Sequence, residues 1–226
     1  MTDRATKETQ YQPSIDIADQ HGQAALGLMI NQAWHDDPKR LTFTFARYKF
    51  AAKMLSGKGR VLEVGCGDGF VSRVVRQEVG ELVAIDFDPV FVDDVNSRMI
   101  EKWRFEARVH DILGAPVSPG GFDAAYSLDV MEHIQPKDEQ AYLSNIAGSL
   151  HEHGVFIAGM PSIESQDYAS PPSKAGHVNC KSAPELKASL EHHFHNVFSF
   201  SMNDEVVHTG YHKMAHYIFA MGVGRK

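Results

Sequence analysis

Residues 61–69 read Val61-Leu62-Glu63-Val64-Gly65-Cys66-Gly67-Asp68-Gly69. The short apolar run that ends at Val64 predicts a buried strand. The three glycines let the backbone turn tightly and approach a ligand without a Cβ atom in the way. Valines then recur at helical spacing over 71–79, which predicts a helix. A strand, a glycine-rich turn and a helix in this order are typical of the ligand-binding unit of a doubly wound α/β sheet.

The spacing and charge of this loop distinguish two classes of ligand. A dinucleotide site uses Gly-x-Gly-x-x-Gly, in which the glycines and the helix N-terminus receive a pyrophosphate. Here the spacing is Gly-x-Gly-x-Gly, and residue 70 is Phe. Glu63 and Asp68 also place carboxylates beside the loop, where they would repel a pyrophosphate. The loop favours a ligand with ammonium and sulfonium groups, as in S-adenosylmethionine.

Two further predicted strands end in carboxylates. Asp86 ends the second strand, 21 residues after Gly65, which is the place of a carboxylate that accepts ribose hydroxyls. Phe87 is then placed to pack beside the adenine. Asp111, followed by Ile112, ends the third strand, where a carboxylate can accept the adenine amino hydrogen. The alternative is that both aspartates only cap loops, as Asp often does.

Strands alternate with helices from residue 57 onward, which predicts a parallel sheet covered on both faces. The last two strands, at 197–202 and 214–221, have no helix between them, and the short 203–213 connection favours an antiparallel hairpin. Residues 162–179 are expected to form a long polar loop. The predicted fold is α/β, a doubly wound Rossmann-like sheet of seven strands with one antiparallel strand at its C-terminal edge.

The chain divides into an N-terminal segment, 1–56, and a ligand-binding domain, 57–226. Residues 1 to about 14 are predicted to be a flexible tail, followed by two helices that meet at Asp36-Asp37-Pro38. We hypothesise that these helices form a lid and line a substrate site, because aromatic and arginine side chains are typical ligand contacts. The residues concerned are Trp34, Arg40, Arg47 and Tyr48. The alternative is that Trp34 and Tyr48 only pack the helices onto the sheet.

Composition excludes several classes of function. The net charge of −7 argues against a nucleic-acid partner, which normally needs a basic surface. The two cysteines exclude a disulfide scaffold and favour a reducing cytoplasmic location. The polar N-terminus is unlike a signal peptide, and no apolar stretch approaches the roughly 18 residues of a membrane span. We expect a cytoplasmic monomer or homodimer.

The chain resembles the class I S-adenosylmethionine-dependent methyltransferases over about residues 58–160. It is most similar to the group that includes ubiquinone-biosynthesis, small-molecule and sugar methyltransferases. The matching text is residues 61–69, then Ala84-Ile85-Asp86, then 122–134, which ends Ser127-Leu128-Asp129-Val130-Met131-Glu132-His133-Ile134. One departure is His151-Glu152-His153-Gly154 where the family usually has Pro-Gly-Gly, far from the donor site.

The resemblance implies S-adenosylmethionine as methyl donor and S-adenosylhomocysteine as product. It also implies that the stretch after the fourth strand, with Leu128, Asp129 and His133, contributes to the donor and acceptor sites. The residues expected to bind the donor are Glu63, Gly65, Cys66, Gly67, Gly69, Asp86, Phe87, Asp111, Ile112 and Leu128.

Methyl transfer requires alignment of donor and acceptor, and a hydroxyl acceptor usually also needs a general base. Histidine is the usual base near neutral pH. His133, after the fourth strand, and His177, in the polar loop, are the catalytic candidates; Asp204 and His208 are weaker ones. The alternative for His133 is that it bonds backbone or packs on the donor. No metal site is predicted, since His-Glu-x-x-His and paired Cys-x-x-Cys are absent, although Asp129 and Glu132 are close in sequence.

The expected function is methylation of an oxygen, or less readily a nitrogen, of a small-molecule acceptor. The polar loops at 162–179 and 203–213 favour a sugar or other polar metabolite. An Asn-Pro-Pro-Tyr-type sequence, expected for amide or base N-methylation, does not follow the fourth strand. Two alternatives stay open: a sensor or scaffold that binds S-adenosylmethionine without turnover, and a nicotinamide-dependent oxidoreductase.

Overall fold

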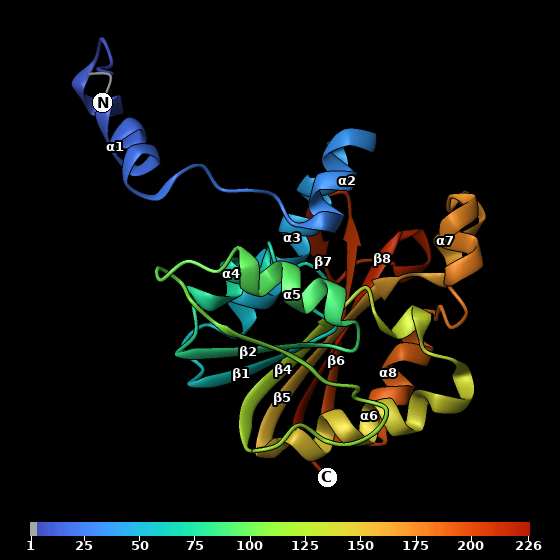
Figure 1. Ribbon diagram of the computed structural model, residues 1–226. Helices are drawn as coiled ribbons and strands as arrows, with labels where there is room; N and C mark the ends of the chain where they lie inside the picture. The colour runs from blue at the N-terminus through green and yellow to red at the C-terminus, as the bar shows by residue number, and fades with distance from the viewer. Residues whose placement is uncertain (1–3) are drawn as a thin grey trace.

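An eight-stranded sheet forms the centre of the computed structural model, which describes residues 4–226. The strand order is β3-β2-β1-β4-β5-β8-β6-β7, and Figure 1 shows helices on both sides of the sheet. The strands are β1 (Arg60–Val64), β2 (Glu81–Asp86), β3 (Glu106–Val109), β4 (Phe122–Leu128), β5 (Leu150–Pro161), β6 (Phe194–Asn203), β7 (Val206–His208) and β8 (Tyr217–Arg225).

Each face of the sheet is covered by its own set of helices, which confirms the predicted doubly wound α/β fold. Side chains of α3, α4 and α5 pack in one apolar core, and side chains of α6 and α8 pack in the other. The helices are α1 (Gln12–His21), α2 (Leu28–Asp36), α3 (Lys39–Met54), α4 (Ser72–Arg76), α5 (Pro89–Ser97), α6 (Glu139–Ser149), α7 (Pro171–Gly176) and α8 (Ala183–Glu191). Short 3₁₀ turns are η1 (Thr9–Tyr11), η2 (Met131–His133), η3 (Pro136–Asp138), η4 (Ile163–Tyr168) and η5 (His212–Met214).

The central strand β1 pairs in parallel with β2 on one side and β4 on the other. Leu62 lies opposite Val83 on β2 and Ala125 on β4. Because both faces of these strands are buried, they are almost continuously apolar rather than alternating. The parallel arrangement brings the carboxyl ends of β1, β2, β3 and β4 to the same edge of the sheet.

The C-terminal hairpin differs in two ways from the prediction. Strand β8 is antiparallel as expected, but it lies between β5 and β6 and not at the edge of the sheet. Its first four residues, Tyr217–Ala220, are fully buried, and an apolar strand of this kind is stabilised inside a sheet rather than at an edge. The sheet has eight strands instead of seven, because 206–208 pairs with 201–203 as the edge strand β7.

The N-terminal segment is more ordered than predicted. The expected flexible tail becomes helical at Thr9, while residues 1–3 lie outside the described residues. The helix expected from residue 15 is interrupted at Gly22, which has a φ of 74°, so that 22–27 is a connection between α1 and α2. Helix α1 buries no residue and stands apart from the body of the molecule (Figure 1).

The other helices also depart from their predicted bounds. Helix α4 ends at Arg76, earlier than the predicted 79, and α5 ends at Ser97. The predicted polar loop at 162–179 contains η4 and α7, because Ser162 and Ser170 accept the N–H groups of residues three positions further on. Among residues 4–226, no helix has the length and apolar character that a membrane crossing requires.

Candidate active site

A cavity of about 500 Å³ lies at the carboxyl ends of β1 to β4. Its lining includes Gly65, Gly67, Asp86, Asp111 and Val130. A second hollow, of about 550 Å³, lies beside Glu81 and Glu106 at the amino ends of β2 and β3. Ligands of doubly wound sheets bind at carboxyl ends, so the first cavity is the candidate site.

The glycine loop fits closely beneath this cavity. Gly65 and Gly67 have φ angles of 75° and 51°, in the left-handed region. A Cβ atom at Gly65 would lie 2.3 Å from Cγ2 of Val130, and one at Gly67 would lie 2.6 Å from the sulfur of Met29. Both conformation and space therefore require glycine at these two positions.

Asp86 connects the second strand to the glycine loop. Its Oδ2 accepts the N–H of Gly67 at 2.9 Å, and its Oδ1 accepts the N–H of Asp88 at 3.0 Å. Each carboxylate oxygen has two acceptor sites, so each keeps one for a ligand hydroxyl. Phe87, next in sequence, is 74% exposed and forms part of the cavity wall.

The third strand end supplies the other predicted wall of the cavity. Asp111 is exposed at the opening, and its Oδ1 accepts the N–H of Leu113 at 2.9 Å. Ile112 lines the cavity and is buried. The sequence analysis did not single out Phe91 and His110, which also line it. Phe91 lies four residues after Phe87, at the spacing that places two aromatic rings on one side of a helix start.

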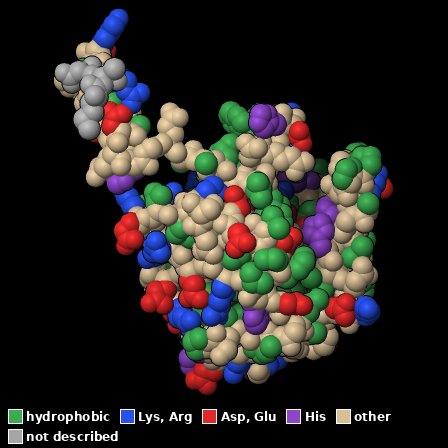
Figure 2. Space-filling model, in the orientation of Figure 1, with side chains coloured by type: hydrophobic (Ala, Val, Ile, Leu, Met, Phe, Trp, Pro, Cys, Tyr) green, Lys and Arg blue, Asp and Glu red, His purple; other side chains and the backbone are tan. Residues whose placement is uncertain are grey.

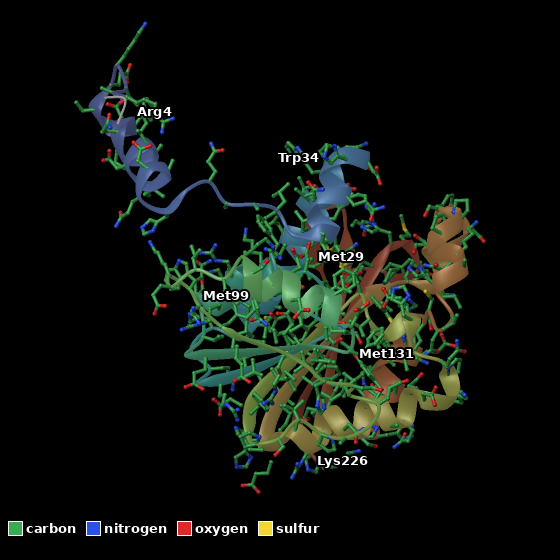
Figure 3. The ribbon with its side chains drawn as sticks, in the orientation of Figure 1. Arg4, Met29, Trp34, Met99, Met131 and Lys226 are labelled. Atoms are coloured by element: carbon green, nitrogen blue, oxygen red, sulfur yellow. The ribbon has the colours of Figure 1, made fainter. Side chains whose placement is uncertain are left out.

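Met29 is a further lining residue that was not expected from the sequence. It comes from α2, where Figure 3 labels it, and is 52% exposed; its sulfur is the atom nearest to the Cβ position of Gly67. The helical spacing of the apolar residues in this segment does not distinguish Met29 from the core residues Ile30 and Ala33. The predicted acceptor residues Trp34 and Arg40 are exposed and lie outside this lining.

Four residues expected to bind the donor lie behind the lining, not on it. Glu63 is 1% exposed and accepts the hydroxyl hydrogen of Tyr48 at 2.8 Å. Burial raises the pKa of Glu63 to about 7. The other three, Cys66, Gly69 and Leu128, support the loop from the core side: Cys66 and Leu128 are buried, and a Cβ atom at Gly69 would lie 2.8 Å from Val95.

An ion pair forms the other side of the cavity. Asp129, directly after β4, has a φ of 59° and lines the cavity. Both of its oxygens accept from Nη1 of Arg47 on α3, each at 2.9 Å. The Arg47 guanidinium lies 4.0 Å from the ring centroid of Tyr217 on β8. Arg47, but not Trp34 or Arg40, thus connects the N-terminal helices to the site.

Buried polar groups surround this ion pair. Glu132 is 1% exposed, and its Oε2 has no hydrogen-bond partner among residues 4–226. Burial, together with the nearby Asp129 charge, raises the pKa of Glu132 well above its usual value. The Tyr217 hydroxyl is also buried and unpartnered within the described chain.

The two predicted catalytic histidines lie together. The ring centroids of His133 and His177 are 5.2 Å apart, and His133 lines the cavity. Burial and the neighbouring His133 lower the pKa of His177. Figure 2 shows histidine side chains beside α7, next to apolar side chains around α5. Asp204 and His208, the weaker candidates, lie near the β7 edge of the sheet, where His208 bonds Asn203.

The cavity suits an adenosyl ligand with a positive charge. Its volume is within the usual range for small-molecule sites, roughly 300–1,000 Å³. The lining is mostly apolar and includes three aspartates but neither Lys nor Arg from the described part of the chain. The unused acceptor sites of Asp86 and the close glycine backbone match the donor set predicted from the sequence. A pyrophosphate would find no cationic side chain here.

Comparison with known proteins agrees with this geometry. The sequence model of a family described as "Methyltransferase domain" matches residues 61–154. A probable S-adenosylmethionine-dependent methyltransferase of Mycolicibacterium smegmatis is 26% identical over 66% of this chain and 58% of its own length. A ubiquinone biosynthesis O-methyltransferase of Xanthomonas campestris pv. campestris is 30% identical over 54% of this chain and 48% of its own length. The chain spans about half the length of these relatives.

A solved structure gives the same fold at low identity. The N-methyltransferase NodS of Bradyrhizobium japonicum, in complex with S-adenosyl-L-homocysteine, has a TM-score of 0.59 and 15% identity, covering 84% of this chain and 89% of NodS. The family match, the sheet order and the cavity at the strand ends point to one conclusion. Residues 61–154 match a methyltransferase domain, and the chain has the fold of the class I S-adenosylmethionine-dependent methyltransferases.

Proposed function

We propose that this protein transfers the methyl group of S-adenosylmethionine to an oxygen of a small-molecule acceptor. The observation that carries the proposal is the cavity at the carboxyl ends of β1 to β4, with its glycine cradle, strand-end aspartates and lack of lining Lys or Arg within the described chain. The similarity to a ubiquinone biosynthesis O-methyltransferase supports oxygen over nitrogen as the acceptor atom.

The donor is held by residues of the first three strand ends. Asp86 would accept the ribose hydroxyls, and Asp111 would accept the adenine amino hydrogen. Phe87 and Ile112 would contact the adenine, since both line the cavity. Gly65 and Gly67 leave room for the amino-acid end of the donor. The bound donor supplies a methyl carbon that its sulfonium has already activated.

The acceptor side is formed by Asp129, Val130 and His133. These residues orient the acceptor oxygen toward the donor and exclude water, which accounts for most of the catalysis in an aligned displacement. Either His133 or His177 is the candidate base that accepts the hydroxyl proton when no metal ion is bound. Imidazole is the usual base near neutral pH, and burial lowers the pKa of His177.

We also propose that the N-terminal segment covers the site. The α2 backbone is fastened to the donor side: the N–H of Ile30 donates to Asp68 at 2.8 Å, and the N–H of Leu28 donates to Asp94 at 3.3 Å. Deleting residues 1–40 should weaken donor binding and turnover. If both survived the deletion unchanged, the segment would not act as a lid.

The test of the donor site is calorimetric titration with S-adenosylmethionine, S-adenosylhomocysteine and NAD. We expect both sulfur ligands to bind and NAD not to bind. Asp86→Asn should weaken binding of S-adenosylmethionine about 10-fold or more. The NH₂ group of the amide replaces one carboxylate oxygen, and it can donate a hydrogen bond but cannot accept one from a ribose hydroxyl. The control is Asp93→Asn, an exposed position on α5. NAD binding without a response to either sulfur ligand would favour an oxidoreductase.

Turnover is tested separately, by methyl incorporation from labelled donor into a panel of phenols, sugars and amines. Transfer to hydroxyl acceptors is the expected outcome. Transfer to amines alone would contradict the oxygen assignment. Donor binding without transfer to any of these acceptor classes would favour the sensor alternative.

A further inference from the structure

Three potential metal ligands meet at the acceptor side of the cavity. Ligand atoms of Glu132, His133 and His177 all lie within 4.8 Å of one another. Two come from η2, directly after β4, and the third ends α7. The backbone holds these segments together, because the N–H groups of Val178 and Asn179 both donate to the carbonyl oxygen of Glu132, at 2.8 and 3.0 Å.

Each of the two histidines has an oxygen partner on one ring nitrogen. Nδ1 of His133 lies 2.9 Å from the carbonyl oxygen of Gly176, and Nδ1 of His177 lies 2.8 Å from Oε1 of Gln166. An oxygen of this kind can only accept, so each Nδ1 carries the hydrogen and each neutral ring keeps its lone pair on Nε2. Metal-ligating histidines are fixed in the same way, by an oxygen partner on the other ring nitrogen.

The third ligand is a buried carboxylate that lacks a partner. Glu132 is 1% exposed, and its Oε2 makes no hydrogen bond within residues 4–226. The nearby Arg47 guanidinium uses its Nη1 for both oxygens of Asp129 instead. An unpaired buried carboxylate is unfavourable unless a cation or donor satisfies it.

We propose that Glu132, His133 and His177 bind one divalent transition-metal ion beside the methyl-transfer site. Three ligand atoms about 2.1 Å from a common ion lie about 3.0–3.6 Å apart, so the side chains have to approach one another by roughly 1 Å. Two imidazoles and one carboxylate suit Zn²⁺, Mn²⁺, Fe²⁺ or Co²⁺ and leave coordination positions open.

The inference rests on the proposed function and refines its chemistry. His133 lines the cavity, so an ion held by this group would lie beside the acceptor. It would lower the pKa of the acceptor hydroxyl, whose proton would pass to water. The oxygen then forms a bond to the methyl carbon, while the carbon–sulfur bond breaks and its electron pair stays on sulfur. The histidines act as ligands in this scheme and not as bases.

The test is metal binding by the full chain after removal of metals with a chelator. Titration with Zn²⁺ by calorimetry and with Co²⁺ by visible absorption should give one ion per chain. His133→Ala and His177→Ala should each weaken binding by more than the about 10- to 100-fold lost when an outer-shell partner is removed. Gln166→Ala should weaken metal binding by about 10- to 100-fold, within the range for an outer-shell partner. Because this variant keeps all three ligands, it still tests the site if a ligand variant fails to fold.

The matched control removes two exposed histidines elsewhere, in the double variant His192→Ala/His195→Ala. This variant should bind the ion like the unaltered chain. The proposal would be overturned if the unaltered chain bound no metal ion. It would also be overturned if His133→Ala and His177→Ala bound the ion as tightly as the unaltered chain. Titration of the metal-free protein with S-adenosylhomocysteine separates the two claims, since donor binding without metal binding refutes only the metal site. Metal binding without donor binding refutes only the proposed function.

Discussion

The donor side and the acceptor side of the cavity are built in different ways. The donor side is local: Asp86 and the Gly67 N–H that it accepts lie 19 residues apart and belong to neighbouring strand ends. The acceptor side is assembled from distant parts of the chain. Arg47 and Asp129 are 82 residues apart, and His133 and Gly176 are 43 apart. The contacts that hold the donor side are therefore separate from those that hold the acceptor side.

The largest expected effect concerns the donor side. Gly65→Ala places a Cβ atom 2.3 Å from Val130 in a left-handed conformation, and we expect about 3–4 kcal/mol of lost stability from strain and overpacking together. Donor affinity should fall with it. Gly57→Ala is the matched control, since Gly57 has a φ of 82° but open space around its Cβ position. Urea unfolding of both variants measures the difference, and equal losses would contradict the packing argument.

The second prediction uses the buried carboxyl behind the glycine loop. The pKa of Glu63 is raised from 4.5 to about 7, so between these values the folded state binds more protons than the unfolded state. The free energy of unfolding should therefore fall as pH rises from 4.5 to 7, by roughly 3 kcal/mol for this group. Glu63→Gln should remove that part of the slope.

Urea unfolding at pH 5 and pH 8 measures this effect. Glu152→Gln serves as control, because Glu152 is exposed. Parallel pH profiles for the unaltered chain and Glu63→Gln would show that Glu63 has an ordinary pKa.

The third prediction concerns the long-range ion pair on the acceptor side. Arg47→Met leaves Asp129 without its partner and should cost about 2 kcal/mol, less than for a fully buried pair because Asp129 is 35% exposed. Adding Asp129→Asn should recover part of this loss. A double-mutant cycle measures the coupling, expected between about 0.5 and 3 kcal/mol. Additive losses would mean that the pair does not hold α3 to β4.

The smallest effect is expected at the N-terminus. Deleting residues 1–22 removes α1, which buries no residue, and should change the free energy of unfolding by less than about 0.5 kcal/mol. Donor affinity should also stay the same. Extending the deletion through 40 removes α2 with Met29 and should weaken donor binding. If the short deletion had the same effect as the long one, α1 and not α2 would be the contributing element.

The contrast also explains how much could be predicted from the sequence. The α/β fold and the strand ends at Val64 and Asp86 follow from short apolar runs and their terminating residues. Strand β8 lies between β5 and β6 because it buries more apolar surface than an edge strand does. The order of the strands along the chain does not reveal this order within the sheet. For the same reason, His133 and His177 could be selected singly, but their pairing with Glu132 depends on how 162–179 folds back.

The limits at the donor side have a different cause. Glu63 and Leu128 fit the pattern of the motif but face the core, because alternate residues of a buried strand point to opposite faces, and Cys66 in the loop is buried as well. Met29 contributes to the cavity from a helix outside the motif. Sequence spacing thus locates the loop, while tertiary packing decides which side chains reach the ligand.

The hydrogen bond from the Gly67 N–H to Asp86 has a kinetic consequence. Because the same carboxylate that awaits the ligand already fixes the loop, the entropy cost of ordering the loop falls on folding rather than on binding. The product can then leave and a new donor molecule can bind without a rearrangement of the glycine loop. Exchange at the donor half should therefore be fast, and the slower rearrangements in a catalytic cycle should be confined to the acceptor half.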